Sequence, residues 1–197
     1  MLTLSLAASA LAGFCAKVVD EFAERGQLWR KNKTKFFLPA LPILLAVIYG
    51  AALGWVSSQT LLSSLFIALA IASLLAGKID HRYHMIGAGV FAVVLLLMPP
   101  TVLDPWLFCL FLVSGLLDEL ELGGMARGPA ALLNRERLWT PIAALGAAWL
   151  LAAPLLYLLA LVAFDLAYRF GGWFMDYEFE ASRAPQPLAK TAKRKRK

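Results

Sequence analysis

The chain has 197 residues, of which 60% are hydrophobic and 16% are charged. Soluble chains carry roughly 25% charged residues, and a soluble core of this size could not enclose so much apolar surface. The composition therefore excludes an ordinary soluble domain and predicts an integral membrane protein. The formal net charge of +6 predicts a basic cytoplasmic surface that contacts anionic lipid head groups, and we expect no nucleic acid partner.

Apolar segments of about 20 residues, the length that spans a bilayer as a helix, recur along the chain. In the second segment, Gly50 and Gly54 have the spacing of small residues at close helix contacts. The stretch from Trp139 to Phe170 is too long for one span. Pro154 favours two short helices in a tight hairpin, because proline is tolerated at a first helical turn and disrupts a helix interior; one long kinked helix is the alternative. The sequence thus predicts an all-α, polytopic transmembrane helical bundle of about seven helices: Leu2–Val19, Phe36–Val56, Leu61–Ile79, Met85–Val102, Trp106–Leu122, Pro141–Ala153 and Pro154–Phe170.

The distribution of basic residues predicts the orientation of the bundle. With seven helices and the N-terminus outside, all 19 Lys and Arg residues fall on the inner side. Six helices would put the basic C-terminus outside and break the positive-inside pattern. We expect a cytoplasmic C-terminus and a first helix that is retained and not cleaved as a signal peptide. The expected location is the cytoplasmic membrane of a prokaryote.

Three regions follow from these patterns. Residues 1–170 form the transmembrane helical domain, residues 171–182 an interfacial aromatic and acidic segment, and residues 183–197 a disordered basic cytoplasmic tail. Each basic residue near an anionic membrane surface contributes about 1 kcal/mol of attraction. The sequence is also compatible with a protein partner that binds the tail and with a homo-oligomer of the bundle.

An aspartate follows apolar residues at the predicted inner end of four helices. A carboxylate at a helix C-terminus is disfavoured by about 0.3–1 kcal/mol, because that end carries partial negative charge. A cation is therefore expected beside each one. In one interpretation local ion pairs supply it: Lys17 and Arg25 for Asp20, Lys78 and Arg82 for Asp80, and Arg169 for Asp165.

In the functional interpretation the carboxylates gather around a cavity that faces the cytoplasm. Asp118 favours it, since this residue shares a helix face with Glu121 and no basic residue follows before Arg127. Oxygen ligands of this kind suit Mg²⁺ held together with substrate phosphates. The leading hypothesis is a divalent-metal-dependent enzyme that acts on a phosphorylated lipid or isoprenoid. Its expected metal ligands are Asp20, Asp80, Asp118 and Asp165, its catalytic residues Asp80, Asp118 and Glu121, and its phosphate-binding residues Lys78, Arg82 and Arg169.

Two other classes of function stay open. A cation, proton or small-solute transporter would place ionisable groups near the middle of the membrane, whereas the sequence puts the acidic residues at helix ends. A non-catalytic membrane subunit or scaffold would use the basic tail for docking. His81 and His84 could bind a transition metal, but histidines at an interfacial turn are more often solvated or exposed to lipid.

Overall fold

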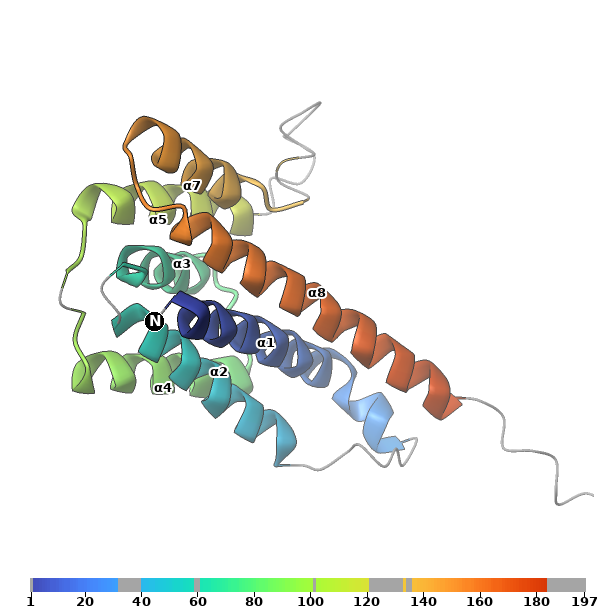
Figure 1. Cartoon of the computed structure of the whole chain (residues 1–197). Helices are drawn as coiled ribbons and strands as arrows, with labels where there is room; N and C mark the ends of the chain where they lie inside the picture. The colour runs from blue at the N-terminus through green and yellow to red at the C-terminus, as the bar shows by residue number, and fades with distance from the viewer. Residues whose placement is uncertain are drawn as a thin grey trace, which may run out of the picture.

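The computed structural model describes residues 2–31, 40–58, 61–100, 102–120, 133 and 136–183 (Figure 1). These residues contain seven helices and no β-strand, so the predicted all-α class is confirmed. The predicted helices correspond to the observed ones in chain order, with shifted ends. The observed helices are α1 (Leu2–Lys31), α2 (Leu41–Ser58), α3 (Ser63–Leu75), α4 (Arg82–Leu97), α5 (Pro105–Glu119), α7 (Trp139–Leu150) and α8 (Leu156–Arg183).

Three of these helices contain stretches long and apolar enough to cross a membrane. The stretches are Leu2–Arg25 of α1, Leu41–Ser58 of α2 and Leu156–Glu180 of α8. The helices α3, α4 and α7 are apolar but shorter. A hydrocarbon core of about 30 Å needs about 20 helical residues, so length and composition alone identify three candidate spans among the described residues.

The chain turns between α7 and α8, where Pro154 predicts a break. Residues 151–155 separate the two helices, and Ala152 has a positive φ of 51°, which excludes one long kinked helix. Beyond this turn, α8 continues past the expected end at Phe170, so residues 171–182 are the last part of that helix. Gly171 lies inside α8 and packs on α1, where a Cβ atom would lie 3.1 Å from the Phe14 carbonyl oxygen.

The two longest helices, α1 and α8, lie side by side and run in the same direction (Figure 1). Gly13 packs against the Phe164 backbone, and further along, Arg25 bonds to Asp176. Both pairs are 151 positions apart in the sequence, and a constant separation at two points means that the helices are parallel. A Cβ on Gly13 would overlap the Phe164 carbonyl oxygen, so glycine is required for this close approach.

A second parallel pair is formed by α2 and α4. Gly50 packs against the Gly87 carbonyl oxygen, and a Cβ added to Gly54 would lie 3.2 Å from the Phe91 carbonyl oxygen. Both pairs are 37 positions apart. The predicted close contact at the Gly50 and Gly54 positions is therefore confirmed, since side chains there would keep the two backbones apart.

The third parallel pair consists of α3 and α5. Gly115 packs on Leu69, and Glu119 lies near Ser73. The two residues of each pair are again the same number of positions apart in the sequence. The Asp118 carboxylate near the end of α5 accepts the backbone N–H of the first residue of α7, so α7 runs back along α5. Consecutive helices among the described residues thus alternate in direction along the chain (Figure 1).

One end of the bundle carries most of the charge. We call it the charged end: α1, α3 and α5 run toward it, and α2, α4 and α7 begin there. Lys78, Arg82 and Arg137 lie at this end, and Lys17 and Arg25 are on the half of α1 that leads to it. The connections at the opposite end, residues 98–100, 102–104 and 151–155, contain no Lys or Arg. In the tertiary structure these basic residues thus lie toward one end of the bundle, as the predicted asymmetry of charge requires.

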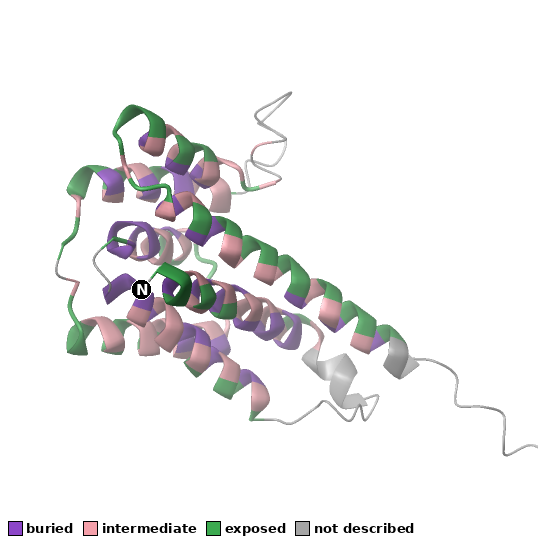
Figure 2. Cartoon of the chain, in the orientation of Figure 1, coloured by how far each residue is buried: buried purple, intermediate pink, exposed green. Residues whose placement is uncertain are grey.

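Buried residues line the faces where helices meet, and exposed ones cover the outer sides of α7 and α8 (Figure 2). Large apolar side chains are among the most exposed, including Leu96, Trp106 and Trp149 at 82–84%. Exposure to water of so much apolar surface is unfavourable at about 25 cal/mol per Å², whereas lipid tails can cover it. The surface therefore supports a membrane environment.

The glycine contacts generate the first prediction. Gly50→Ala forces a methyl group against the Gly87 carbonyl oxygen, and overpacking of this kind destabilises by about 1–3 kcal/mol. Gly89→Ala is the matched control, since a Cβ there meets no atom within 4 Å and alanine is favoured over glycine in a helix by about 0.5–1 kcal/mol. Unfolding in detergent should show a loss of stability for Gly50→Ala and none for Gly89→Ala. Equal effects at both positions would contradict the close approach of α2 and α4.

Candidate functional site

A chain of hydrogen bonds connects side chains from four helices. His84 of α4 places Nε2 2.7 Å from Oδ1 of Asp20 on α1. The Tyr168 hydroxyl on α8 donates to the other oxygen of the same carboxylate. On the far side of the imidazole, the Tyr49 hydroxyl on α2 lies 3.2 Å from Nδ1. We call these four residues the Tyr–His–Asp–Tyr chain.

The close helix contacts bring this chain together. Gly87 lies one turn after His84, and its contact with α2 holds Tyr49 beside the imidazole. In the same way, the approach of α1 to α8 at Gly13 brings Asp20 within reach of Tyr168. The chain is largely enclosed, because the side chains of His84 and Asp20 are 16% and 24% exposed.

The geometry accommodates two protonation states of His84. In the neutral ring, Nε2–H donates to Asp20 and Nδ1 accepts from the Tyr49 hydroxyl. In the imidazolium, Nδ1–H donates to the Tyr49 oxygen. The Tyr49 hydroxyl can then turn its hydrogen to the His84 backbone carbonyl oxygen, which lies 3.3 Å away. Neither state leaves a ring nitrogen without a partner.

An ion-pair network adjoins the chain on the side of the charged end. The buried Glu21 carboxylate, 4% exposed, receives Lys17 Nζ at 2.9 Å and Arg25 Nε at 3.0 Å. Arg25 also binds Asp176 on α8 at 2.6 Å. Lys17 and Arg25 were expected as ion-pair partners of Asp20. They pair with Glu21 because it lies four residues from each of them, on the same face of α1.

Asp118, expected as a metal ligand and catalytic residue, caps a helix. Its two carboxylate oxygens accept the backbone N–H groups of Trp139 and Thr140, at 2.9 and 2.8 Å. These are the first residues of α7, whose N-terminus has unpaired N–H groups and partial positive charge. The start of α7 therefore supplies the partial positive charge that a carboxylate at the end of α5 requires.

The other predicted site residues lie apart. Asp165 pairs with Arg169 at 2.8 Å on the exposed surface of α8, as the local interpretation predicts. Asp80 and Lys78 are exposed in the connection before α4, and Arg82 bonds to the hydroxyl of Tyr83 at 2.8 Å. Glu121 lies outside the described residues.

No metal-binding cluster is found in the described part of the chain. It contains no group of three or more His, Cys, Asp or Glu side chains that could hold a metal ion. The predicted Mg²⁺ site therefore stays a prediction. His81 is the residue before α4, where its ring accepts the Tyr83 backbone N–H, while His84 lies inside the bundle. The two histidines thus serve different partners, and a shared transition-metal site is not formed.

Sequence reasoning missed three of the four residues of the Tyr–His–Asp–Tyr chain. His84 was expected to be solvated or exposed to lipid, and Tyr49 and Tyr168 were not considered. For Tyr49 a signal was present, because it is a polar residue in the interior of the apolar segment Phe36–Val56, where hydrogen-bonding groups need partners. Tyr168 lies two residues before the predicted end of its segment at Phe170, so the sequence offered no such signal for it. The partners themselves depend on which helices pack together.

Comparisons with known proteins give no guide to this site. No protein-family model, curated protein or solved structure matches the chain.

The capping contact generates the second prediction. Asp118→Ala removes the acceptor of two backbone N–H groups, and loss of an N-cap destabilises by about 0.5–2 kcal/mol. Asp165→Ala is the matched control, because an exposed ion pair within one helix contributes about 0.3–0.5 kcal/mol. Unfolding in detergent, followed by circular dichroism, should show the larger loss for Asp118→Ala. An equal or smaller loss would mean that Asp118 does not hold the start of α7.

Proposed function

We propose that this chain is a polytopic protein of the cytoplasmic membrane of a prokaryote, and that it moves protons through the Tyr–His–Asp–Tyr chain. In this proposal the helices cross the membrane seven times, with the N-terminus outside and the charged end in the cytoplasm. The observation that carries the proposal is the placement of His84, whose two ring nitrogens bond to Asp20 on one side and Tyr49 on the other.

The depth of these residues supports a transport function. Tyr49 is the ninth of 18 residues in the candidate span Leu41–Ser58, and Tyr168 is the thirteenth of 25 in Leu156–Glu180. Asp20 is the nineteenth of 24 in Leu2–Arg25, and His84 is the third residue of α4. The chain thus extends from the charged end, where Asp20 and His84 lie, toward the middle of two candidate spans. Transporter sites commonly lie near the middle of the membrane, and His and carboxylate side chains form proton relays that lead to it.

Magnitudes argue against a role in packing alone. A hydrogen bond between membrane helices contributes only about 0.6 kcal/mol on average. An aspartate at the centre of a spanning helix costs about 2.5–3.5 kcal/mol, and Asp20 lies between that centre and the inner end of its span. Buried polar groups of this kind add little to stability, and apolar side chains of similar volume often stabilise the same contacts better, so the presence of Asp20 and His84 favours a function.

The chemistry of histidine fits proton movement better than metal or base chemistry here. A metal ligand or a general base needs one free ring nitrogen directed at its partner, and both nitrogens of His84 are already bonded within the protein. In the neutral ring, Nδ1 can take the proton of the Tyr49 hydroxyl, which receives another proton in exchange, while Nε2 releases its own proton to Asp20. Rotation of the ring then restores the first tautomer, and Asp20 releases its proton toward the charged end.

The enzyme hypothesis remains an expectation that a metal titration can test. A ligand at about 100 times its dissociation constant stabilises the folded state by roughly 2.7 kcal/mol. If protons are what the chain moves, Mg²⁺ and Mn²⁺ should leave the melting temperature of the purified protein unchanged. A metal-dependent shift that disappears in Asp118→Ala would instead favour carboxylates that hold a metal ion for phosphate chemistry.

Proton flux into vesicles tests the proposal directly. The purified chain is reconstituted in liposomes that contain a pH-sensitive dye, and a potassium gradient with valinomycin supplies the driving voltage. We expect acidification faster than in empty vesicles. Asp20→Asn and His84→Gln should reduce the rate to that of empty vesicles, because each interrupts the chain, while the exposed Asp165→Asn should leave the rate unchanged.

Melting temperatures of all variants establish that the reconstituted proteins are folded. Tyr168→Phe is a conservative second change, since it removes one hydroxyl from Asp20 and keeps the ring. A wild-type flux equal to that of empty vesicles, or full flux in folded Asp20→Asn and His84→Gln, would overturn the proposal.

A further inference from the structure

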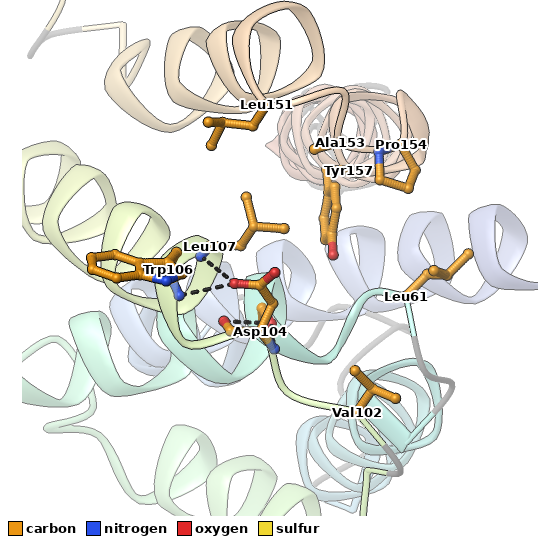
Figure 3. Close-up of a pocket in the computed structure, with 10 residues that line it drawn as sticks. Leu61, Val102, Asp104, Trp106, Leu107, Leu151, Ala153, Pro154 and Tyr157 are labelled. Atoms are coloured by element: carbon orange, nitrogen blue, oxygen red, sulfur yellow. Dashed lines mark hydrogen bonds between the residues drawn. The ribbon is translucent and has the colours of Figure 1, made fainter.

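A cavity of about 620 Å³ opens at the end of the bundle opposite the charged end. The starts of α3 and α5 and the α7–α8 connection surround it (Figure 3). Its walls are mostly apolar, with Leu61, Val102, Trp106 and Leu151 among them. Among the described residues that line it there is no Lys or Arg. The cavity is separate from the Tyr–His–Asp–Tyr chain and shares no residue with it.

One carboxylate is held rigidly in the cavity wall. Oδ1 of Asp104 accepts the backbone N–H groups of Trp106 and Leu107, at 2.9 and 3.0 Å. The Ser64 hydroxyl accepts the Asp104 N–H at 3.0 Å and donates to its carbonyl oxygen at 3.2 Å. Within the described part of the chain, all hydrogen bonds of the side chain end on Oδ1. Oδ2 is left to the cavity.

A phenol hydroxyl faces the same space. Tyr157 is 5% exposed, and its ring packs on Phe111 with the centroids 5.2 Å apart. Its hydroxyl and the Asp104 carboxylate point into the cavity from different walls (Figure 3). A helix cap explains the bonds of Oδ1, but it does not explain why a buried tyrosine directs its only polar atom toward the second carboxylate oxygen.

The cavity therefore has one negative charge, two oxygen acceptors and apolar walls. The start of α5 offsets part of the charge, about half of an elementary charge, and leaves the remainder for a ligand. An ammonium group has three donors and a positive charge, which match Oδ2 and the Tyr157 hydroxyl. The apolar walls match a hydrocarbon chain attached to it, and an anion or a neutral polar molecule has no complement here.

From this complementarity we infer that the cavity binds a primary ammonium group carried on an apolar chain. Asp104 and Tyr157 bind the ammonium, and the apolar walls receive the chain. Such a group occurs in two sources, the head group of an aminophospholipid in the adjacent leaflet and a free amphiphilic amine.

Binding of n-octylammonium tests the inference, with n-octanol as the neutral probe of equal chain length. Both are titrated into the full-length protein in maltoside detergent, and the rise in melting temperature is converted to a dissociation constant. We expect the ammonium to bind at least about tenfold more tightly than the alcohol, because a hydrogen bond to a charged group contributes about 1.5–3 kcal/mol.

Matched variants identify the site. Asp104→Asn should abolish the preference for the ammonium and keep the fold, because asparagine caps a helix as well as aspartate does. Tyr157→Phe should weaken the ammonium and leave the alcohol unchanged, while the exposed Asp165→Asn should change neither. No preference for the ammonium in the wild type, or an unchanged preference in folded Asp104→Asn, would overturn the inference.

Nanodiscs distinguish the two sources. Phosphatidylethanolamine that lowers the apparent affinity for octylammonium, relative to phosphatidylcholine discs of equal charge, assigns the cavity to the lipid head group. Equal affinity in both discs assigns it to a free amine.

Discussion

The contacts of glycines with neighbouring backbones are the constraint on which the arrangement of polar groups depends. At Gly13 and Gly50 the helices approach so closely that a methyl group would overlap a carbonyl oxygen. Small residues of this kind are the usual means by which membrane helices pack, because lipid provides no hydrophobic force between helices. Here the short distance between helix backbones also allows polar side chains on different helices to come within hydrogen-bonding distance. A carboxylate, an imidazole and two phenols from four helices meet only because α1 and α8, and α2 and α4, lie so near each other.

The carboxylates illustrate how tertiary context assigns different uses to one residue type. Asp118 holds the start of α7, Asp165 forms an exposed pair within its own helix, and Asp20 bonds to an imidazole and a phenol inside the bundle. All three occur in the same apolar sequence context. The predicted position at a helix C-terminus, and with it the helix-dipole argument, holds for Asp118 alone, because α1 continues to Lys31 and α8 to Arg183. Each carboxylate nevertheless has a different partner: helix N–H donors, an arginine, or a histidine together with a tyrosine.

The two ends of the bundle differ in chemistry. The charged end gathers lysines and arginines, which fits contact with anionic lipid, and the Tyr–His–Asp–Tyr chain extends from that side toward the middle of the candidate spans. The opposite end has no basic residue in its described connections, and its cavity contains the carboxylate of Asp104. If both proposals hold, the protein has two separate sites: a proton pathway near the charged end and an amine-binding cavity at the opposite end.

The sequence by itself determined the all-α class, the order of the helices, the break near Pro154, the close contact at Gly50 and Gly54, and the asymmetry of charge. These features follow from local chemistry: hydropathy over a helix length, the missing N–H of proline, and the volume of a side chain. Only the tertiary structure decided that Arg25 bonds to Asp176 on α8, that Asp118 caps α7, and that His84 lies between Asp20 and Tyr49. Those outcomes depend on which helices are neighbours and at what offset, and a single sequence contains no measure of either. Helix packing determines the partners of a polar side chain in an apolar bundle. The sequence therefore shows which polar residues are present, but it does not show which groups they bond to.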